Sequence, residues 1–314
     1  MRMKKMQKML VALSALLCAA SIHAASDVGQ ADASSSPLTS SNDAALQNLE
    51  IDFGAAVKPA NLKLRSSAVL VVDQGRGEVL YAKNTGAVMP IASITKLMTA
   101  MVVLDANLPL DQPIAIENAD VDTLRRSSSR LRVGSALPRG ELLRLALMAS
   151  ENRAAAALAR AYPGGKPAFI AAMNRKAADL GMSSTHFVDS SGLHSENVSN
   201  AQDLVRLVNA GYGYDLIREF TTTSRHQVAP AGMKRAMAFK NSNGLVKKKN
   251  WQIGLSKTGY IQESGRCLVM QAKIAARSVI IVLLDSWGKR TRIADANRIK
   301  KWMEGGVGRK QRLS

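Results

Sequence analysis

The sequence is poor in the residues that stabilise disulfide-rich proteins and that bind catalytic metals. It has two cysteines and four histidines among 314 residues. It lacks a His-Glu-x-x-His zinc motif, a Gly-x-Ser-x-Gly nucleophile motif and a Gly-x-x-x-x-Gly-Lys-Ser/Thr phosphate loop. These absences argue against a disulfide-stapled fold, a zinc peptidase of that type, an α/β-hydrolase and a P-loop nucleotide-binding protein.

Acidic residues are also scarce. The chain has 24 Asp and Glu against 43 Lys and Arg, which gives a formal net charge of +19. With 46% hydrophobic and 21% charged residues it has the composition of a folded protein rather than of a disordered polyelectrolyte. The positive charge is compatible with an anionic polymer or a membrane surface as partner, and equally with a basic surface that has no dedicated ligand.

The first 24 residues have the pattern of a secretory signal peptide. Four basic residues precede an apolar run of 14 residues, at positions 9–22, and small residues follow it at positions 24–26. The run is shorter than the roughly 20 residues of a membrane-crossing helix, and no later stretch approaches that length. We expect cleavage after Ala24 and export to a periplasm. An uncleaved membrane helix and a lipid-modified Cys18 are the alternatives.

Export has consequences for charge and for cysteine chemistry. Cleavage would remove four basic residues and leave a net charge of +15, and export disfavours nucleic acid as a natural ligand. It would also remove Cys18, so Cys267 would have no intramolecular disulfide partner. Residues 25–65 are rich in Ser, Ala, Asp and Asn and predict a flexible leader, and residues 305–314 predict a basic tail.

The remaining pattern predicts one α+β domain over residues 66–304. Apolar runs predict a β-hairpin at 67–73 and 78–84. Helical spacing of apolar residues occupies 93–106, 140–162, 166–182 and 200–212. Strands return at 251–261, 265–275 and 277–287, and a last helix fits 290–304. Because the late connections are short, we expect the N-terminal hairpin and the C-terminal strands to form a single antiparallel sheet covered by helices.

Three short motifs on this framework could carry chemistry. They are Ser93-x-x-Lys96, Ser150-x-Asn152 and Lys257-Thr258-Gly259. Ser-x-x-Lys recurs at 286–289, and Ser-x-Asn recurs at 40–42 and 195–197, whereas Lys-Thr-Gly is unique in the chain. Position favours the first set, because Ser93 opens a predicted helix and residue 286 follows a strand. Ser195 and Asn197 remain the alternative to Ser150 and Asn152.

The residue types suit nucleophilic catalysis without histidine. A serine hydroxyl is a weak nucleophile until a base takes its proton, and a lysine with a lowered pKa can be that base. Ser93 and Lys96, three residues apart, share one face of the first helical turn. The Ser93 N–H and the positive end of the helix dipole can stabilise negative charge on an attacked carbonyl.

The other two motifs suit substrate binding and proton transfer. On a strand, Lys257 and Thr258 can bind a carboxylate, and Gly259 lets a peptide backbone approach and pair as an added strand. Ser150 could relay protons near Lys96, and Asn152 could donate to a substrate amide oxygen. Taken alone, each motif is also compatible with a helix cap or an ordinary edge strand.

Taken together, the motifs resemble the penicillin-recognising serine DD-peptidases, and more narrowly the low-molecular-mass D-alanyl-D-alanine carboxypeptidase and endopeptidase family. The resemblance covers residues 66–287 and looks closest to the periplasmic endopeptidase branch. The stretches that carry it are PIASITKLMTA, LMASENRAAAALA, FVDSSGLHSENVS and GLSKTGYIQESGRCLV. It implies a β-lactamase/transpeptidase-like fold with a helical subdomain beside the sheet.

The resemblance also implies a role for each motif residue. Ser93 would be the acyl-ester nucleophile, Lys96 its proton acceptor and Ser150 a further proton carrier. The substrate would be held by Asn152, Lys257, Thr258 and Gly259, with an oxyanion hole from the N–H groups of Ser93 and Tyr260. The implied ligands are cross-linked stem peptides of peptidoglycan, with β-lactam antibiotics as covalent inhibitors, and neither a metal nor an organic cofactor is expected.

Two departures from related patterns narrow the expected reaction. No Glu-x-x-Leu-Asn element of a class A β-lactamase lies between Asn152 and Lys257, so penicillin should trap Ser93. Only 27 residues follow Trp287, whereas membrane-anchored DD-carboxypeptidases continue into a further domain and an amphipathic helix. We therefore expect an endopeptidase without an integral membrane span. A DD-carboxypeptidase and a non-enzymatic basic peptidoglycan-binding protein are the alternatives.

Overall fold

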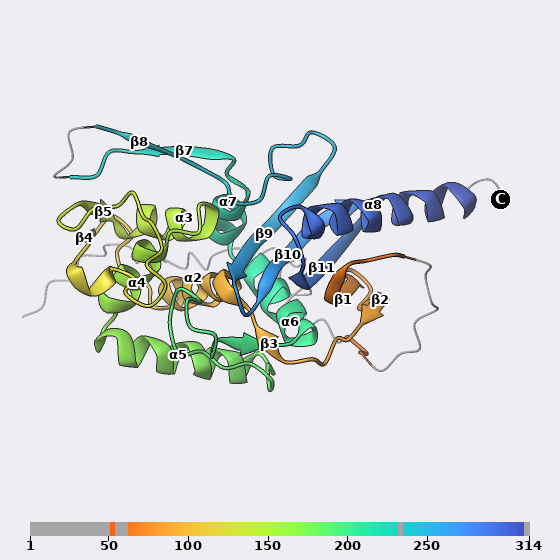
Figure 1. Cartoon of the computed structure of the whole chain (residues 1–314), viewed down its shortest axis with the longest axis horizontal. Helices are drawn as coiled ribbons and strands as arrows, with labels where there is room; N and C mark the ends of the chain where they lie inside the picture. Colours follow the sequence, from red (N-terminus) through yellow and green to blue (C-terminus); the bar gives the residue numbers. More distant parts are fainter. Residues whose placement is uncertain (1–50, 54–61, 232–234, 311–314) are drawn as a thin grey trace, which may run out of the picture. The chain divides into compact units, whose positions relative to one another are not determined.

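A five-stranded antiparallel sheet joins both ends of the described chain (Figure 1). This computed structural model describes residues 51–53, 62–231 and 235–310. The strand order is β2-β1-β11-β10-β9. The bounds are β1 Ser66–Asp73, β2 Glu78–Lys83, β9 Gln252–Ile261, β10 Gly265–Ile274 and β11 Arg277–Ser286. The predicted union of the N-terminal hairpin with the C-terminal strands is confirmed.

The chain divides into two units, Met1–Leu38 and Thr39–Ser314, and the fold belongs to the second. The expected signal peptide, residues 1–24, lies outside the described residues. So does most of the expected leader, residues 25–65. None of the helices in the described ranges combines the length and the apolar character that crossing a membrane requires.

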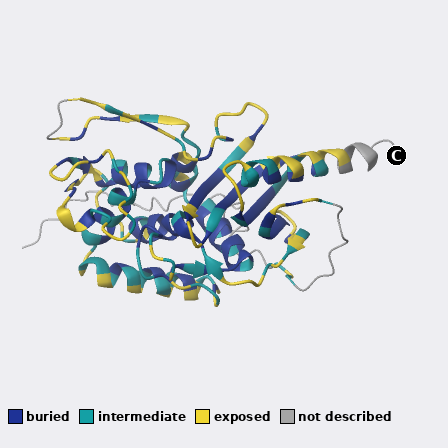
Figure 2. Ribbon diagram, in the orientation of Figure 1, coloured by how far each residue is buried: buried dark blue, intermediate teal, exposed yellow. Residues whose placement is uncertain are grey.

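Both faces of the sheet are buried, which explains why its strands read as continuous apolar runs. Alternate side chains of β1 belong to different cores: Leu70 packs with the helical side, whereas Val71 packs against the C-terminal helix. Figure 2 shows this buried layer between its two coverings. The helices are α2 Lys96–Asp105, α3 Arg139–Met148, α4 Asn152–Arg160, α5 Gly165–Asp179, α6 Ala201–Tyr212, α7 Asp215–Thr222 and α8 Thr291–Lys310.

The C-terminal helix α8 covers one face and is tied to the first strand through one carboxylate. Asp295, which is fully buried, accepts hydrogen bonds from the Ser66 N–H and hydroxyl, both at 2.8 Å, and from the Arg65 N–H at 3.0 Å. Arg298 pairs with the same carboxylate at 2.7 Å. The helix continues to Lys310, beyond the residue 304 at which the sequence pattern ended it.

The helical side differs from the prediction at one junction that matters for function. The predicted helix over 140–162 is two helices, because Ser150 has a φ of +62°, a left-handed conformation that ends α3 and turns the chain into α4. The sequence pattern did not show the smaller elements. These are β3 Met89–Pro90, η1 Ala92–Thr95, β4 Pro113–Ala115, η2 Asn118–Asp120, β5 Ala136–Pro138, β6 Val198–Ser199, α7, β7 Arg225–Val228 and β8 Met237–Lys240.

Candidate active site

Ser93 lies on a tight turn between β3 and α2. It belongs to the short 3-10 helix η1, and α2 begins at Lys96. The preceding Ala92 has a φ of +47°, which is unfavourable for a residue with a side chain, and its carbonyl accepts a hydrogen bond from the Thr95 hydroxyl at 2.8 Å. This strained turn leaves Ser93 partly exposed while its neighbours Ala92 and Ile94 are buried.

Lys96 is buried directly beneath Ser93. Its Nζ lies 2.8 Å from Ser93 Oγ, 2.7 Å from Asn152 Oδ1 and 2.6 Å from the Ser191 carbonyl oxygen. The Asn152 amide is oriented by its Nδ2, which donates to Ser127 Oγ at 2.9 Å, so Oδ1 faces the lysine. A neutral amine has two N–H groups, which match these two acceptors, and one lone pair, which is left for the Ser93 hydroxyl.

The surroundings of Lys96 favour that neutral form. Burial lowers the pKa of Lys96 from 10.5 to about 7, although Asp189 and Glu151 oppose the shift by favouring the charged form. The side chain is fully buried, and no carboxylate among the described residues forms an ion pair with it. Near neutral pH this lysine can therefore accept a proton from Ser93.

A second buried lysine, Lys257, lies on the other side of the site. Its Nζ donates to Ser150 Oγ at 2.8 Å and to the Thr258 carbonyl at 3.1 Å. Burial lowers its pKa well below the usual range, and the cations of Lys96 and Arg292 lower it further. The structure thus pairs Ser150 with Lys257, whereas the sequence interpretation placed it near Lys96, a position that Asn152 occupies.

Strand β9 passes very close to the Ser93 turn. A Cβ atom on Gly259 would lie 2.8 Å from the Ile91 carbonyl oxygen and 3.2 Å from the Ser93 nitrogen, so only glycine fits without displacement. Because β9 is the last strand of the sheet, its outer edge can pair with an extended peptide. Arg292 of α8 donates to the Gly259 carbonyl at 2.7 Å and holds the strand from behind.

A loop that the motifs did not single out closes the site opposite β9. Asp189 organises it by accepting hydrogen bonds from the N–H groups of Gly192, at 2.6 Å, and His194, at 2.8 Å. Gly192 has a φ of +78°, and a Cβ atom there would lie 1.9 Å from the Ala92 carbonyl oxygen. This loop lies within the stretch FVDSSGLHSENVS, whose sequence gave no sign that the Ser191 carbonyl contacts Lys96.

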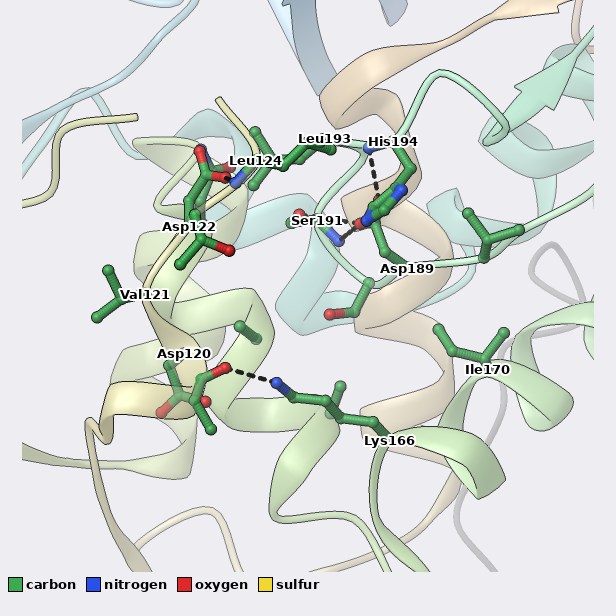
Figure 3. A pocket seen from close by; sticks show the side chains of 17 residues that line it. Asp120, Val121, Asp122, Leu124, Lys166, Ile170, Asp189, Ser191, Leu193 and His194 are labelled. Atoms are coloured by element: carbon green, nitrogen blue, oxygen red, sulfur yellow. Dashed lines mark hydrogen bonds between the residues drawn. The ribbon is translucent and has the colours of Figure 1, made fainter. Parts of the chain in front are cut away.

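A cavity of about 340 Å³ opens beside Asn152 and the Ser191 loop (Figure 3). Its walls are the 119–124 loop, α4 and residues 188–194, and Lys166 of α5 closes it with a hydrogen bond to the Ala119 carbonyl at 2.6 Å. It extends the site away from β9. A substrate group attached beyond the reacting carbonyl can therefore enter it.

The remaining predicted residues lie where they can contact a substrate on β9. Thr258 donates from Oγ1 to Ser242 Oγ at 2.8 Å, and the sequence analysis did not identify Ser242. Tyr260 is 55% exposed, and the Arg266 guanidinium stacks on its ring. The alternative Asn197 is fully buried and braces the 189 loop by donating to Thr95 Oγ1 and to the Asp189 carbonyl.

The three histidines within the described ranges do not gather with acids or cysteine into a group of three that could hold a metal ion. His226 pairs with Glu141 at 2.6 Å, away from Ser93. Cys267 is buried and free, and burial raises the pKa of its thiol to about 11.

Comparison with known proteins places this geometry among related enzymes. A family model described as D-alanyl-D-alanine carboxypeptidase (peptidase S11) matches residues 55–288. A D-alanyl-D-alanine endopeptidase from Pseudomonas aeruginosa is 49% identical over 248 residues, which are 79% of this chain and 80% of that protein. One with the same name from Escherichia coli is 44% identical over 80% of this chain and 81% of its own length.

Solved structures show the same architecture. The crystal structure of the Streptomyces K15 DD-transpeptidase superposes with a TM-score of 0.72 at 30% sequence identity. The match covers 79% of this chain and 98% of that chain. The similarity therefore spans the sheet, the helical side and all three motifs.

Proposed function

The chain belongs to the D-alanyl-D-alanine carboxypeptidase family of serine-type DD-peptidases, and from that premise we propose that it is a D-alanyl-D-alanine endopeptidase. It cleaves peptide cross-links of peptidoglycan through an acyl-enzyme on Ser93. The observation that supports the mechanism is the 2.8 Å contact of Ser93 Oγ with a buried lysine whose pKa is about 7. The preference for cross-links rests on relatives of 49% and 44% identity that are named endopeptidases.

Acylation begins with proton transfer from Ser93 to Lys96. Neutral Lys96 keeps its two N–H groups on Asn152 and Ser191, so its lone pair takes the proton as Ser93 Oγ attacks the D-alanyl carbonyl. In this proposal the N–H groups of Ser93 and Tyr260 stabilise the negative charge that develops, and the support is that β9 approaches the Ser93 turn closely at Gly259, the residue before Tyr260.

Substrate binding and departure of the leaving group use the second lysine. Lys257 and Thr258 bind the carboxylate next to the scissile bond, and the peptide pairs with the edge strand at Gly259. Ser150 gives its proton to the leaving amine and takes one from the Lys257 ammonium that contacts its Oγ, while Lys96 holds the proton that it took from Ser93. Asn152 presents its amide to the substrate while its oxygen holds Lys96. Water then hydrolyses the ester, and penicillin acylates the same serine.

The decisive experiment uses a purified cross-linked muropeptide dimer that keeps a terminal D-Ala-D-Ala. Incubation with the mature protein should split the dimer and leave the terminal D-Ala in place, as followed by mass spectrometry. Ser93→Ala should neither split the dimer nor release D-Ala. Removal of the terminal D-Ala alone would establish the alternative, a DD-carboxypeptidase. Turnover by Ser93→Ala equal to that of wild type would show that Ser93 is not the nucleophile.

We propose that the protein acts in the periplasm. Residues 1–24 would direct export, 25–65 would form the leader, 66–304 the catalytic domain and 305–314 the basic tail. Peptidoglycan lies outside the cytoplasm, so an enzyme that cuts it has to be exported. Mass spectrometry of the protein from bacterial envelopes should find an N-terminus at Ala25. An intact N-terminus would contradict the proposed cleavage site.

A further inference from the structure

A basic cavity next to Thr258 is not used by the mechanism above. It encloses about 220 Å³ between the β7–β8 hairpin and the loop that follows β8. Its charged lining residues are Arg225, Lys240 and Lys247, all three exposed, and its lining contains no acidic side chain. Within the described ranges none of the three forms an ion pair. The cavity is therefore a concentrated positive site.

The hairpin places two of these cations directly opposite each other. Arg225 and Lys240 are register partners across the antiparallel β7–β8 ladder, a position in which like charges destabilise a sheet. The nearby acid does not relieve this repulsion, because Glu141 pairs with His226, and the neighbouring His226 points to the opposite face of the strand from Arg225. An anion in the cavity would relieve it.

A buried amide in the cavity wall adds an independent indication of a ligand. Asn243 lines the cavity and is 1% exposed. Its Oδ1 accepts the Leu245 N–H at 3.0 Å, which settles the amide orientation and leaves Nδ2 buried without a hydrogen-bond partner among the described residues. A buried donor without an acceptor is unfavourable, so the wall of this cavity contains a polar group that no described residue satisfies.

The loop that carries Asn243 is rigid and leads straight to the active site. Asn241 Nδ2 donates to the Thr221 and Thr223 carbonyls at 2.9 and 2.8 Å. The Ser242 N–H donates to the Met148 carbonyl at 2.8 Å, and its hydroxyl accepts from Thr258. Ser242 thus lies between two residues that line the cavity and contacts Thr258, one of the two residues proposed to bind the substrate carboxylate. A second anionic group on the same substrate can reach it.

We propose that this cavity is an anion subsite that takes a free carboxylate of the second peptide strand in a cross-linked substrate. The inference rests on the proposed function, since only a cross-linked substrate presents a second strand beyond the scissile bond. Arg225, Lys240 and Lys247 supply the charge, and the unpaired amide of Asn243 lies in the cavity wall. The subsite would favour cross-linked peptides over a single stem that ends at the carboxylate on Lys257.

The test measures binding of the muropeptide dimer to the Ser93→Ala protein, in which turnover does not interfere. Replacing Arg225, Lys240 and Lys247 together by Gln should raise the Kd of the dimer about ten-fold, since exposed charge contacts each contribute modestly. The matched control replaces Lys63, Lys273 and Lys301 by Gln. These are exposed, without ion pairs in the described structure, and equal in charge, so their loss should change Kd less than two-fold.

Two ligand variations identify what occupies the cavity. The first is a synthetic dimer in which the carboxylate next to the scissile bond is kept and the other carboxylates of the second strand are replaced by amides. This dimer should bind the parent Ser93→Ala protein about ten-fold more weakly than the unmodified dimer does. The Gln triple variant should bind the two dimers equally. Equal binding of both dimers to the parent protein would overturn the proposal. A second result would also overturn it: inorganic phosphate binds the parent protein but not the triple variant, while both proteins bind the dimer equally. The cavity would then bind a free anion rather than the substrate.

The subsite and the endopeptidase activity fail in different ways. If wild type binds the dimer but releases only terminal D-Ala, the proposed function is wrong, and the Kd comparison still decides whether the cavity binds a carboxylate. If wild type splits the dimer and both triple variants bind it with equal Kd, the proposed function stands and the subsite does not.

Discussion

At the scale of single residues, the proposed role of Lys96 as the base predicts how acylation depends on pH. At a pH below the Lys96 pKa of about 7 the amine is charged and has no lone pair for the Ser93 proton, and at a higher pH the lone pair is free. The rate of penicillin acylation should therefore rise about ten-fold per pH unit below 7 and level off above it. Stopped-flow measurement with a fluorescent penicillin gives the profile.

Lys96→Arg is the matching variant for this prediction. An arginine keeps its charge throughout this pH range and cannot accept the proton. We expect acylation to fall by about 10²- to 10⁴-fold and the rise near pH 7 to disappear. Lys273→Gln, which changes an exposed lysine, should keep the wild-type profile. A flat wild-type profile between pH 5 and 9 would rule out Lys96 as the base.

Gly259 supports a second prediction at this scale. In Gly259→Ala the new methyl group would meet the Ile91 carbonyl at 2.8 Å, and neither backbone can move freely. We expect a loss of stability of about 1–3 kcal/mol, measured by urea unfolding, and acylation slowed because the strand moves away from Ser93. Gly86→Ala is the control, since no atom lies within 4 Å of a Cβ there. Equal acylation by both variants would contradict the tight approach.

At the scale of elements, the carboxylate of Asp295 ties α8 to the first strand. Asp295→Ala would leave the Ser66 N–H and hydroxyl without their buried acceptor. The expected cost is about 2–4 kcal/mol in the free energy of unfolding, because several buried donors lose one partner. Glu304→Ala removes an exposed partner of Lys300 on the same helix and should change stability by less than about 0.5 kcal/mol. A similar loss of unfolding free energy in Asp295→Ala and Glu304→Ala would mean that Asp295 does not anchor α8 to β1.

The regular elements could be predicted because their patterns are local. The β1–β2 hairpin follows from two apolar runs around a glycine-rich turn, and β9 to β11 follow from three runs with short connections. The α3–α4 break could not be predicted, since the left-handed Ser150 is held by its contact with Lys257, 107 residues away. The short strands β7 and β8 lack a strong apolar alternation and pair only with each other, in a separate two-stranded sheet.

In the candidate site too, relations between residues near in sequence could be predicted, whereas contacts between distant residues could not. Motif spacing anticipated that Ser93 and Lys96 share a turn, because that relation is local. It could not anticipate that Asn152 rather than Ser150 would contact Lys96, or that the Ser191 carbonyl would be its third neighbour. Ser242 gave no signal in the sequence, since its contact with Thr258 depends on how the loop after β8 folds back.

At the scale of the whole molecule, the sheet depends on the last strand of the chain. β11 lies between β1 and β10, so a chain that ends before Arg277 leaves both without their shared partner. A nested set of C-terminal truncations should therefore show labelling by fluorescent penicillin only when β11 is present. Labelling of a chain that ends at Ile274, which retains all three motifs, would show that the sheet is not required for acylation.

The pairing of β1 with β11 also determines when, during synthesis of the chain, the active site can form. Ser93 and Lys96 are synthesised before β9, which approaches the Ser93 turn, and before β11, which pairs with β1, and contacts so distant in sequence form slowly. A partly made chain therefore carries its nucleophile without the means to use it. An enzyme that cuts load-bearing polymer stays harmless while it is being produced, and an antibiotic that acylates the finished enzyme finds no target in the growing chain.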